Sequence, residues 1–350
     1  MEKLTIAGRT VGPGEAPFVI AEIGSNHNGD MTLARELIDA ASQSGADAVK
    51  FQSWSSASLI SRAEYARNTQ YADKKRHFGT LHEMVTRYQL TPEQHRGLAD
   101  YCGGRNIPFL SSCFSPTEVD LLDELAVPVF KIASMDLNHL PLLAHVARKG
   151  KPVILSTGMG ELSEIDRALA VLRSGGAGPI ALLHCVSLYP PPTESINLRN
   201  IPTLQRVFGV PVGFSDHTLG TWAALASVAM GACILEKHFT LDKEMAGWDH
   251  WISADPAELS TLVREARAVL QALGSEARTL TEAERAKRLS FRRRVVLKRA
   301  LPKGHRLSDC DLDFKRPGNG IAPDQAAWVV GRSLARDLDE DAELEWTDLV

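Results

Sequence analysis

Eight short apolar segments rich in β-branched residues alternate with longer amphipathic segments, and this alternation constrains the fold more than any other feature of the chain. Such a βα repeat predicts a parallel sheet covered by helices, and eight units within about 250 residues are typical of a (β/α)8 TIM barrel. An open doubly wound sheet is the alternative, but no G-x-G-x-x-G turn follows the first strand, which favours a closed barrel. The predicted strands lie at residues 17–23, 47–52, 107–112, 127–134, 151–157, 179–185, 210–217 and 232–239.

The last amphipathic helix of this pattern indicates where the barrel ends. It begins at the capping residue Asp255 and ends at Gly274, so we expect a barrel domain over residues 1–274. The following residues, 275–290, are charged and lack an apolar stripe, which predicts a linker with some helix. Residues 291–350 contain short apolar runs and turn signals, and they predict a second domain too small to be strongly stable alone.

Composition excludes several classes of protein. The chain has 350 residues, 44% apolar and 23% charged, which rules out a disordered protein. Its 39 basic and 43 acidic side chains give a net charge of −4, which argues against a nucleic acid or an anionic membrane as partner. The five cysteines form no C-x-x-C pair, as is typical of a reduced, cytoplasmic protein. The longest nearly apolar stretch, residues 222–235, is too short to span a membrane.

The carboxyl ends of the predicted strands are unusually polar, and in a barrel these ends surround one mouth. Lys50 and Lys131 lie in the apolar contexts VKFQ and FKIAS, which exclude water. Together with neighbouring hydroxyls they predict a cradle for a small phosphorylated or carboxylated anion. The alternative is that the lysines merely extend to solvent. We would favour it for a single lysine, but not for two lysines in such apolar contexts. Other polar residues at the strand ends are Glu22, Gln52, Ser112, Ser134, Ser156 and Ser215.

Two histidines end consecutive predicted strands. His217 in FSDH and His238 in LEKH should lie side by side at the same height. Two imidazoles so placed can hold a divalent metal and leave positions open for water and substrate. No third ligand is evident, so a pair of core histidines stays open as the alternative. The histidines at positions 77, 82, 95, 139, 145 and 305 are expected on the solvated surface.

A long segment separates the second and third predicted strands. It runs from Trp54 to about Thr80 and carries basic and aromatic residues that include Tyr71, Lys74 and Lys75. Connections of this length are commonly functional lids or binding loops. We expect a lid over the barrel mouth, with a solvated charged surface as the alternative.

Eight segments in order carry a resemblance that covers nearly the whole chain. They are AEIGSNHNGD, VKFQ, FKIAS, ILSTGMG, LLHC-x-x-x-YP, GFSDHT, LEKHFT and the C-terminal FKRPGNGI. With them the chain resembles the sialic acid synthase (N-acetylneuraminate synthase) family. The resemblance implies a TIM barrel followed by a small antifreeze-like (SAF) domain. It also implies condensation of phosphoenolpyruvate with an N-acetylated hexose to a nine-carbon 2-keto sugar acid and phosphate, through C–O cleavage.

The resemblance further implies roles for individual residues. Those that would bind phosphoenolpyruvate are Lys50, Ser112, Lys131, Ser134, Ser156 and Ser215. A divalent metal, Mn²⁺ with Mg²⁺ or Co²⁺ as alternatives, would be held by His217 and His238 and would activate the open-chain aldehyde, with Glu22 near the reacting carbons. Sugar-contacting positions are matched by Gln52, Tyr189 and Asp249, and by Arg316. The last matches an arginine that one subunit inserts into the barrel mouth of another, which implies a domain-swapped homodimer.

Two departures from the family pattern concern the acceptor sugar. Ser187 stands where the family commonly has Asn, and AGWDHWIS replaces a proline-bearing GPDH segment. The acceptor therefore stays open between N-acetylmannosamine and a 2,4-diacetamido-trideoxyhexose, which lead to sialic acid and to legionaminic or pseudaminic acid respectively. One alternative is a synthase of 3-deoxy-octulosonate or heptulosonate phosphate, which the C-terminal KRPGNG segment disfavours. Another is a non-catalytic sugar-binding or ice-binding protein, which the intact lysines and histidines disfavour.

Overall fold

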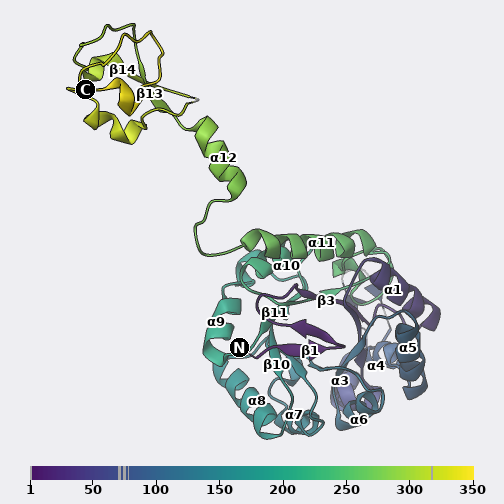
Figure 1. Cartoon of the computed structure of the whole chain (residues 1–350). Helices are drawn as coiled ribbons and strands as arrows, with labels where there is room; N and C mark the ends of the chain where they lie inside the picture. Colours follow the sequence, from purple (N-terminus) through teal and green to yellow (C-terminus); the bar gives the residue numbers. More distant parts are fainter. Residues whose placement is uncertain (1, 70–71, 74–75, 78, 317) are drawn as a thin grey trace. The chain divides into compact units, whose positions relative to one another are not determined.

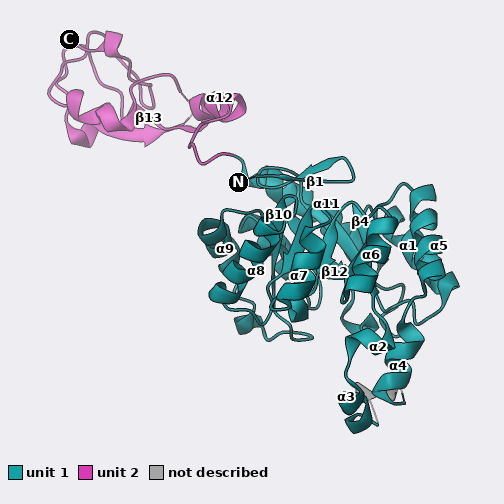
Figure 2. Ribbon diagram, turned by 90° about the horizontal axis from the view of Figure 1, so that it is seen from below, with its two compact units in different colours: residues 1–274 teal, residues 275–350 magenta. Residues whose placement is uncertain are grey.

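The computed structural model describes residues 2–69, 72–73, 76–77, 79–316 and 318–350. The chain divides into two compact units, unit 1 at Met1–Gly274 and unit 2 at Ser275–Val350 (Figure 2). Each unit is described separately below. Within the described residues, no helix is long and apolar enough to cross a membrane.

Unit 1 is a closed barrel of eight parallel strands, which confirms the predicted (β/α)8 fold. Around the barrel the strands follow one another in the order β10-β11-β12-β3-β4-β7-β8-β9, so each pairs with its neighbours in sequence. All eight predicted strands are present. They are β3 (Phe18–Gly24), β4 (Ala48–Ser53), β7 (Phe109–Cys113), β8 (Phe130–Ile132), β9 (Val153–Ser156), β10 (Ile180–Cys185), β11 (Val212–Asp216) and β12 (Ile234–His238).

Helices surround the barrel and bury their apolar faces against the strands (Figure 1). They are α1 (Met31–Gln43), α5 (Pro92–Gly104), α6 (Pro116–Glu124), α7 (Leu140–Ala147), α8 (Leu162–Ser174), α9 (Asn200–Phe208), α10 (Trp222–Ala229) and α11 (Pro256–Leu273). The predicted last helix, α11, is capped by Asp255, whose Oδ1 accepts from Glu258 N at 2.9 Å, and it is followed by Gly274 at φ +57°. One surface prediction is wrong, because His95 lies on the inner face of α5 and is buried with Leu98 and Cys102.

A short hairpin fills the amino end of the barrel. It consists of β1 (Leu4–Ile6) and β2 (Arg9–Val11), and the sequence analysis did not predict it. Leu4, Ile6 and Val11 are buried in one cluster with inward-facing barrel residues such as Phe18 and Ile154. This packing closes the barrel floor and leaves the carboxyl ends of the strands to form a site.

The segment predicted as a lid contains regular structure. It includes α2 (Ser56–Leu59), α3 (Arg62–Arg67), β5 (Ala72–Asp73) and β6 (Arg76–His77), and α4 (Leu81–Tyr88) follows it. Tyr65 and Leu59 pack against a cluster built on Trp54 and α4, so this part is a small folded excursion and not an open loop. The predicted lid residues Tyr71, Lys74 and Lys75 lie outside the described residues. A lid role stays a prediction.

Unit 2 has its own small core. It contains α12 (Glu282–Phe291), in the region predicted as a partly helical linker, and an antiparallel pair, β13 (Arg294–Leu297) and β14 (Leu312–Lys315). No residue of α12 is buried, whereas Val295 and Leu297 of β13 pack with Leu344 and other apolar residues into a separate cluster. Short 3-10 helices occur in both units, at Ser134–Asp136, Thr193–Ser195, His250–Ile252, Asp309–Asp311, Pro323–Trp328 and Trp346–Asp348.

Candidate active site

A pocket of about 240 Å³ opens at the carboxyl ends of the barrel strands. It brings together eleven of the thirteen residues that the sequence analysis assigned to a site. These are Glu22, Lys50, Gln52, Ser112, Lys131, Ser134, Ser156, Tyr189, Ser215, His217 and His238. The two outside its lining are Asp249 and Arg316.

Strand register explains why residues so distant in sequence meet here. Parallel pairing sets Glu22 of β3 level with both Lys50 of β4 and His238 of β12. On the other side of the barrel, Ser112 of β7 is level with Lys131 of β8. Because side chains alternate along a strand, these residues all project inward at the same end of the barrel.

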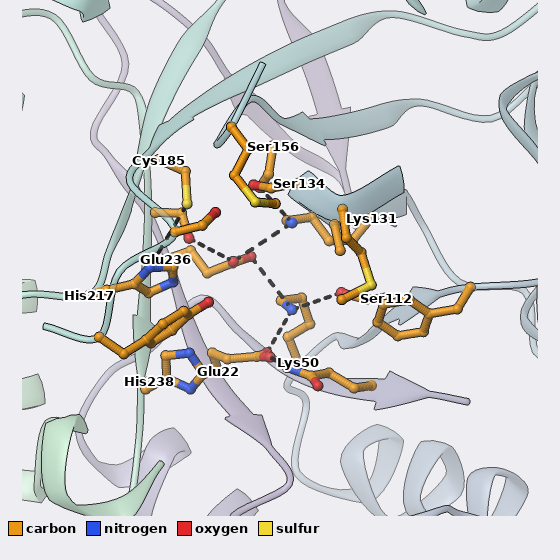
Figure 3. Close-up of a pocket in the computed structure, with 18 residues that line it drawn as sticks. Glu22, Lys50, Ser112, Lys131, Ser134, Ser156, Cys185, His217, Glu236 and His238 are labelled. Atoms are coloured by element: carbon orange, nitrogen blue, oxygen red, sulfur yellow. Dashed lines mark hydrogen bonds and ion pairs between the residues drawn. The ribbon is translucent and has the colours of Figure 1, made fainter. Parts of the chain in front are cut away.

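Each lysine is held by a hydroxyl and lies close to carboxylates (Figure 3). Lys50 Nζ donates to Ser112 Oγ at 3.0 Å, lies 2.8 Å from Glu22 Oε2 and is 3.8 Å from Glu236 Oε2. Lys131 Nζ donates to Ser156 Oγ at 2.8 Å and to the Ile132 carbonyl at 3.1 Å. It also lies 3.7 Å from Glu236 Oε1. Glu236 therefore lies between the two ammonium groups.

Burial and mutual attraction together set the charges of this cluster. Burial raises the pKa of Glu22, and Lys50 only partly opposes it. Burial by itself would lower the pKa of Lys50, but the carboxylates of Glu22 and Glu236 outweigh it and the net shift is upward. For Lys131 burial prevails and lowers the pKa, so this lysine gains most from a second anion. The cluster thus contains equal numbers of basic and acidic side chains, two lysines and two glutamates.

The serine hydroxyls of the pocket accept hydrogen bonds at some positions and donate them at others. Ser112 and Ser156 accept from the lysines, and Ser134 Oγ accepts from Gly158 N at 3.0 Å. Ser215 Oγ instead donates to Glu236 Oε1 at 3.1 Å. Lysine charge and directed hydroxyl donors are what a phosphate or carboxylate ligand requires.

The rings of His217 and His238 lie side by side, with centroids 5.5 Å apart. His217 Nδ1 donates to the Val186 carbonyl at 2.9 Å, which directs Nε2 away from the backbone. His238 Nδ1 is buried without a hydrogen-bond partner among the described residues and lies 3.7 Å from Asp249 Oδ2. A backbone carbonyl thus orients the ring of His217, and His238 has a buried ring nitrogen without a hydrogen-bond partner among the described residues. Both features suit metal ligands.

The same two histidines differ in their affinity for protons. Burial lowers the pKa of His238 well below its usual value, and the neighbouring His217 adds to this effect. Burial would also lower the pKa of His217, but Cys185 and the Val186 carbonyl outweigh it and raise the pKa to about 9. Metal binding requires both imidazoles unprotonated, so it would release a proton from His217. Among the described residues, no group of three or more His, Cys, Asp or Glu side chains could hold a metal, so the pair suits an open site with two protein ligands.

The predicted sugar-contacting residues are only partly assembled. Tyr189 stacks on His217 with ring centroids 4.1 Å apart, and Gln52 Nε2 donates to Glu22 Oε1 at 2.6 Å. Asp249 lies near His238 at the edge of the site. Arg316 belongs to unit 2, where its guanidinium stacks on the ring of Phe291 at 5.1 Å.

Two titratable residues of the pocket, Glu236 and Cys185, received no role from the sequence. Glu236 lies two residues before His238 and so shares its face of β12. Cys185 lines the pocket with its Sγ 3.9 Å from His217 Nδ1. The period of two along a strand would have identified Glu236, whereas an apolar run ending in cysteine gives no comparable signal.

Comparison with known proteins agrees with this geometry. Residues 37–278 match the model of the NeuB family, and residues 292–350 match that of the SAF domain. The N,N'-diacetyllegionaminic acid synthase of Legionella pneumophila is 40% identical over 94% of this chain and 93% of its own length. Human N-acetylneuraminate-9-phosphate synthase is 35% identical over 95% of this chain and 93% of its own length.

A solved structure is similar as well. The N-acetylneuraminic acid synthetase of Leptospira borgpetersenii, crystallised with citrate, is 33% identical and superposes with a TM-score of 0.74 over 82% of this chain and 95% of the other. The first family match covers the barrel from within α1 onward, with every lining residue of the pocket except Glu22, and the second match covers the small C-terminal domain. This chain therefore belongs to the NeuB family of synthases, and it is an enzyme built from a TIM barrel followed by an SAF domain.

Proposed function

We propose that this enzyme condenses phosphoenolpyruvate with an unphosphorylated N-acetylated hexose to give a nine-carbon 2-keto sugar acid and phosphate. The observation that carries the proposal is the convergence of Lys50 and Lys131 with five serines, beside His217 and His238, in one pocket. Relatives named for the synthesis of legionaminic and sialic acids support the same class of reaction.

In this proposal the two lysines hold the anionic groups of phosphoenolpyruvate. Each ammonium already has a serine hydroxyl within 3.0 Å, so an anion placed between them meets charge and directed donors together. Glu236 lies 3.7 Å from Lys131 and 3.8 Å from Lys50, so the substrate must compete with this carboxylate for the two ammonium groups. Holding the substrate in this way removes the entropic cost of bringing two reactants together.

Glu22 is placed to assist the chemistry. Attack of C3 of phosphoenolpyruvate on the aldehyde carbon leaves positive charge at C2, which water captures before phosphate leaves by C–O cleavage. Gln52 and Lys50 fix the Glu22 carboxylate at 2.6 and 2.8 Å, and burial raises its pKa. A carboxyl group with these properties can orient the water and accept its proton.

We further propose that His217 and His238 hold a divalent cation, Mn²⁺ with Mg²⁺ or Co²⁺ as alternatives. When bound, such a cation supplies Lewis-acid polarisation of the aldehyde oxygen. The Val186 carbonyl keeps the His217 ring in the orientation required of a ligand.

The pocket lining favours an acceptor without phosphate. Among the described residues, Lys50 and Lys131 are the only Lys or Arg side chains in the pocket lining, and both are buried next to glutamates. Apolar or aromatic side chains, Phe114, Met135 and Met159, form other parts of the lining. A sugar phosphate would require a further cation, whereas a 2,4-diacetamido-trideoxyhexose presents a methyl group that suits such a lining. N-acetylmannosamine is the other acceptor we propose.

We also propose a domain-swapped homodimer in the cytoplasm. Exposed large apolar side chains follow three of the barrel strands, as interfaces commonly show: Met159 and Leu188 lie in loops, and Trp222 begins α10. Arg316 would contact the sugar in the partner's barrel. All five cysteines are unpaired, which supports a reducing compartment.

Phosphate release from phosphoenolpyruvate, measured with a panel of acceptors and Mn²⁺, tests the proposal. The panel contains N-acetylmannosamine, its 6-phosphate, a 2,4-diacetamido-trideoxyhexose and erythrose 4-phosphate. We expect release with an unphosphorylated N-acetylated hexose. Activity that requires a phosphorylated aldose without an acetamido group would favour a heptulosonate-type synthase instead.

A further inference from the structure

The basic residues of unit 2 are concentrated in one part of its sequence. Residues 285–316 contain twelve Lys and Arg against three Asp and Glu, whereas residues 317–350 contain two against eight. A stretch so strongly positive repels itself unless counter-charges lie close to it. The positions of its arginines are therefore informative.

Four of these arginines line one cavity of about 460 Å³, here called the arginine cavity. Arg288 lies in the last turn of α12, Arg292 and Arg293 follow this helix, and Arg294 begins β13. The other lining residues, among them the acidic Asp324, are Gly320, Ala322, Pro323, Asp324 and Gln325. All of these residues belong to unit 2, and none of them is among the lining residues of the barrel pocket.

Among the described residues, no carboxylate is paired with any of the four guanidinium groups. None of them forms an ion pair within 4.0 Å in the part of the chain that the structure describes. Arg293 Nη1 donates to the Phe314 carbonyl at 2.9 Å and Arg294 Nη1 to the Arg293 carbonyl at 3.1 Å, contacts that orient the groups but do not neutralise them. Arg294 Nε is buried and has no acceptor among the described residues.

Elsewhere in unit 2, two buried carboxylates form ion pairs with arginines. Asp311 lies 3.0 Å from Arg299, and Asp348 lies 2.7 Å from Arg336. The same unit thus neutralises these arginines with its own acids and leaves the arginine cavity positive. This difference indicates that the counter-charge of the cavity comes from outside the unit.

We propose that the arginine cavity binds a small ligand carrying two or more phosphate groups. The planar guanidinium forms paired hydrogen bonds with phosphate oxygens, and several such groups suit clustered negative charge. A single phosphate would leave most of a 460 Å³ cavity empty, whereas a diphosphate or a nucleotide fits the size range of small-molecule sites. Asp324 opposes the anion and limits its affinity.

The probe is inorganic pyrophosphate, titrated calorimetrically into the full-length protein in 150 mM NaCl with phosphoenolpyruvate present to fill the barrel pocket. The test variant is Arg292→Ala/Arg293→Ala, in which both substituted side chains are exposed. Its matched control is Arg278→Ala/Arg285→Ala, which removes the same charge from the same unit outside the cavity. We expect Kd for pyrophosphate to rise at least tenfold in the test variant and to stay within twofold in the control. Asp324→Asn should lower it at least twofold.

Inorganic phosphate should bind at least tenfold more weakly than pyrophosphate to the wild-type protein. Equal weakening in the two double variants would show general electrostatic attraction and would overturn the proposal, as would an absence of binding to the wild type. Sedimentation velocity tests whether the arginines instead contact a second copy of this chain. If the test variant dissociates a dimer but binds pyrophosphate unchanged, the arginines face a second copy of this chain and the ligand proposal is wrong. Should the test variant fail to fold, Arg292→Lys/Arg293→Lys retains charge without the planar fork and should bind pyrophosphate at least threefold more weakly.

Discussion

Replacing Lys131 with alanine should weaken phosphoenolpyruvate binding strongly and sugar binding little. Lys131 is buried in the barrel pocket, where its Nζ donates to Ser156 Oγ at 2.8 Å and lies 3.7 Å from Glu236 Oε1. Under the proposed function this ammonium group contacts the anionic substrate and not the acceptor. The substitution therefore removes a charge from one substrate only.

The size of the effect follows from the geometry of the cluster. Two unit charges separated by 3.7 Å attract by about 4.5 kcal/mol at an effective dielectric constant of about 20. Glu236 already takes up part of this attraction, so the substrate gains less than the full amount. A charge-assisted contact typically contributes about 1.5 to 3 kcal/mol, and about 1.4 kcal/mol corresponds to a factor of ten. We expect KM for phosphoenolpyruvate to rise roughly a hundredfold.

Initial rates with each substrate varied at saturating concentration of the other measure both KM values. Lys149→Ala is the matched control, because this lysine pairs with Asp120 and Asp123 away from the pocket and its loss should change neither KM by more than twofold. Circular dichroism and thermal melting establish that both variants are folded. A rise of less than threefold for phosphoenolpyruvate, or equal rises for the two substrates, would refute the assignment of Lys131.

Three further predictions concern the metal, the dimer and unit 2. EDTA should abolish activity, and Mn²⁺ should restore it. His217→Ala and His238→Ala should each abolish turnover in a folded protein. Activity that does not change on addition of EDTA would exclude the metal site. Mixing inactive Arg316→Ala with inactive His217→Ala at equal amounts should restore about a quarter of the sites after subunit exchange, because half of the dimers are mixed and each has one intact site. No recovery after verified exchange would place Arg316 outside the partner's site. Asp311→Ala should destabilise unit 2 by about 2 kcal/mol in chemical denaturation, because its carboxylate is buried and hydrogen-bonded. The Ser308 hydroxyl holds the pKa of Asp311 well below its usual range. The contribution of Asp311 to the stability of unit 2 is therefore complete above pH of about 4 and is lost as the pH falls further. A wild-type melting temperature of unit 2 that is constant from pH 5 to pH 2 would contradict this.

The barrel could be predicted because its strands are short, buried on both faces and separated by recognisable helix caps. The run from Ile234 to His238 is an example, since every residue of it is buried and Gly231 precedes it closely. The position of Lys50 and Lys131 in one pocket followed from the same pattern, because strand ends of a closed parallel barrel share one mouth.

Other features depend on packing that a single sequence does not reveal. The segment Leu4–Val11 is too short and turn-rich to indicate that it closes the barrel floor. His95 resembles a surface residue in the sequence, because the sequence does not show which face of α5 packs on the barrel. In the structure His95 lies on that face, with its Nε2 2.6 Å from Ser53 Oγ. The role of Glu236 between two lysines depends on distances across the barrel, which involve strands far apart in sequence.

The most direct test of the central claim uses phosphoenolpyruvate labelled with ¹⁸O in the bridging C–O–P oxygen, incubated with enzyme, Mn²⁺ and each acceptor of the panel. Mass spectrometry then follows the sugar acid and the released phosphate. We predict that an unphosphorylated N-acetylated hexose is converted to a nine-carbon 2-keto acid with one phosphate released per molecule, and that the label appears in the phosphate. Consumption of phosphoenolpyruvate without an acceptor, or retention of the label in the keto acid, would contradict a condensation with C–O cleavage in the two-lysine pocket.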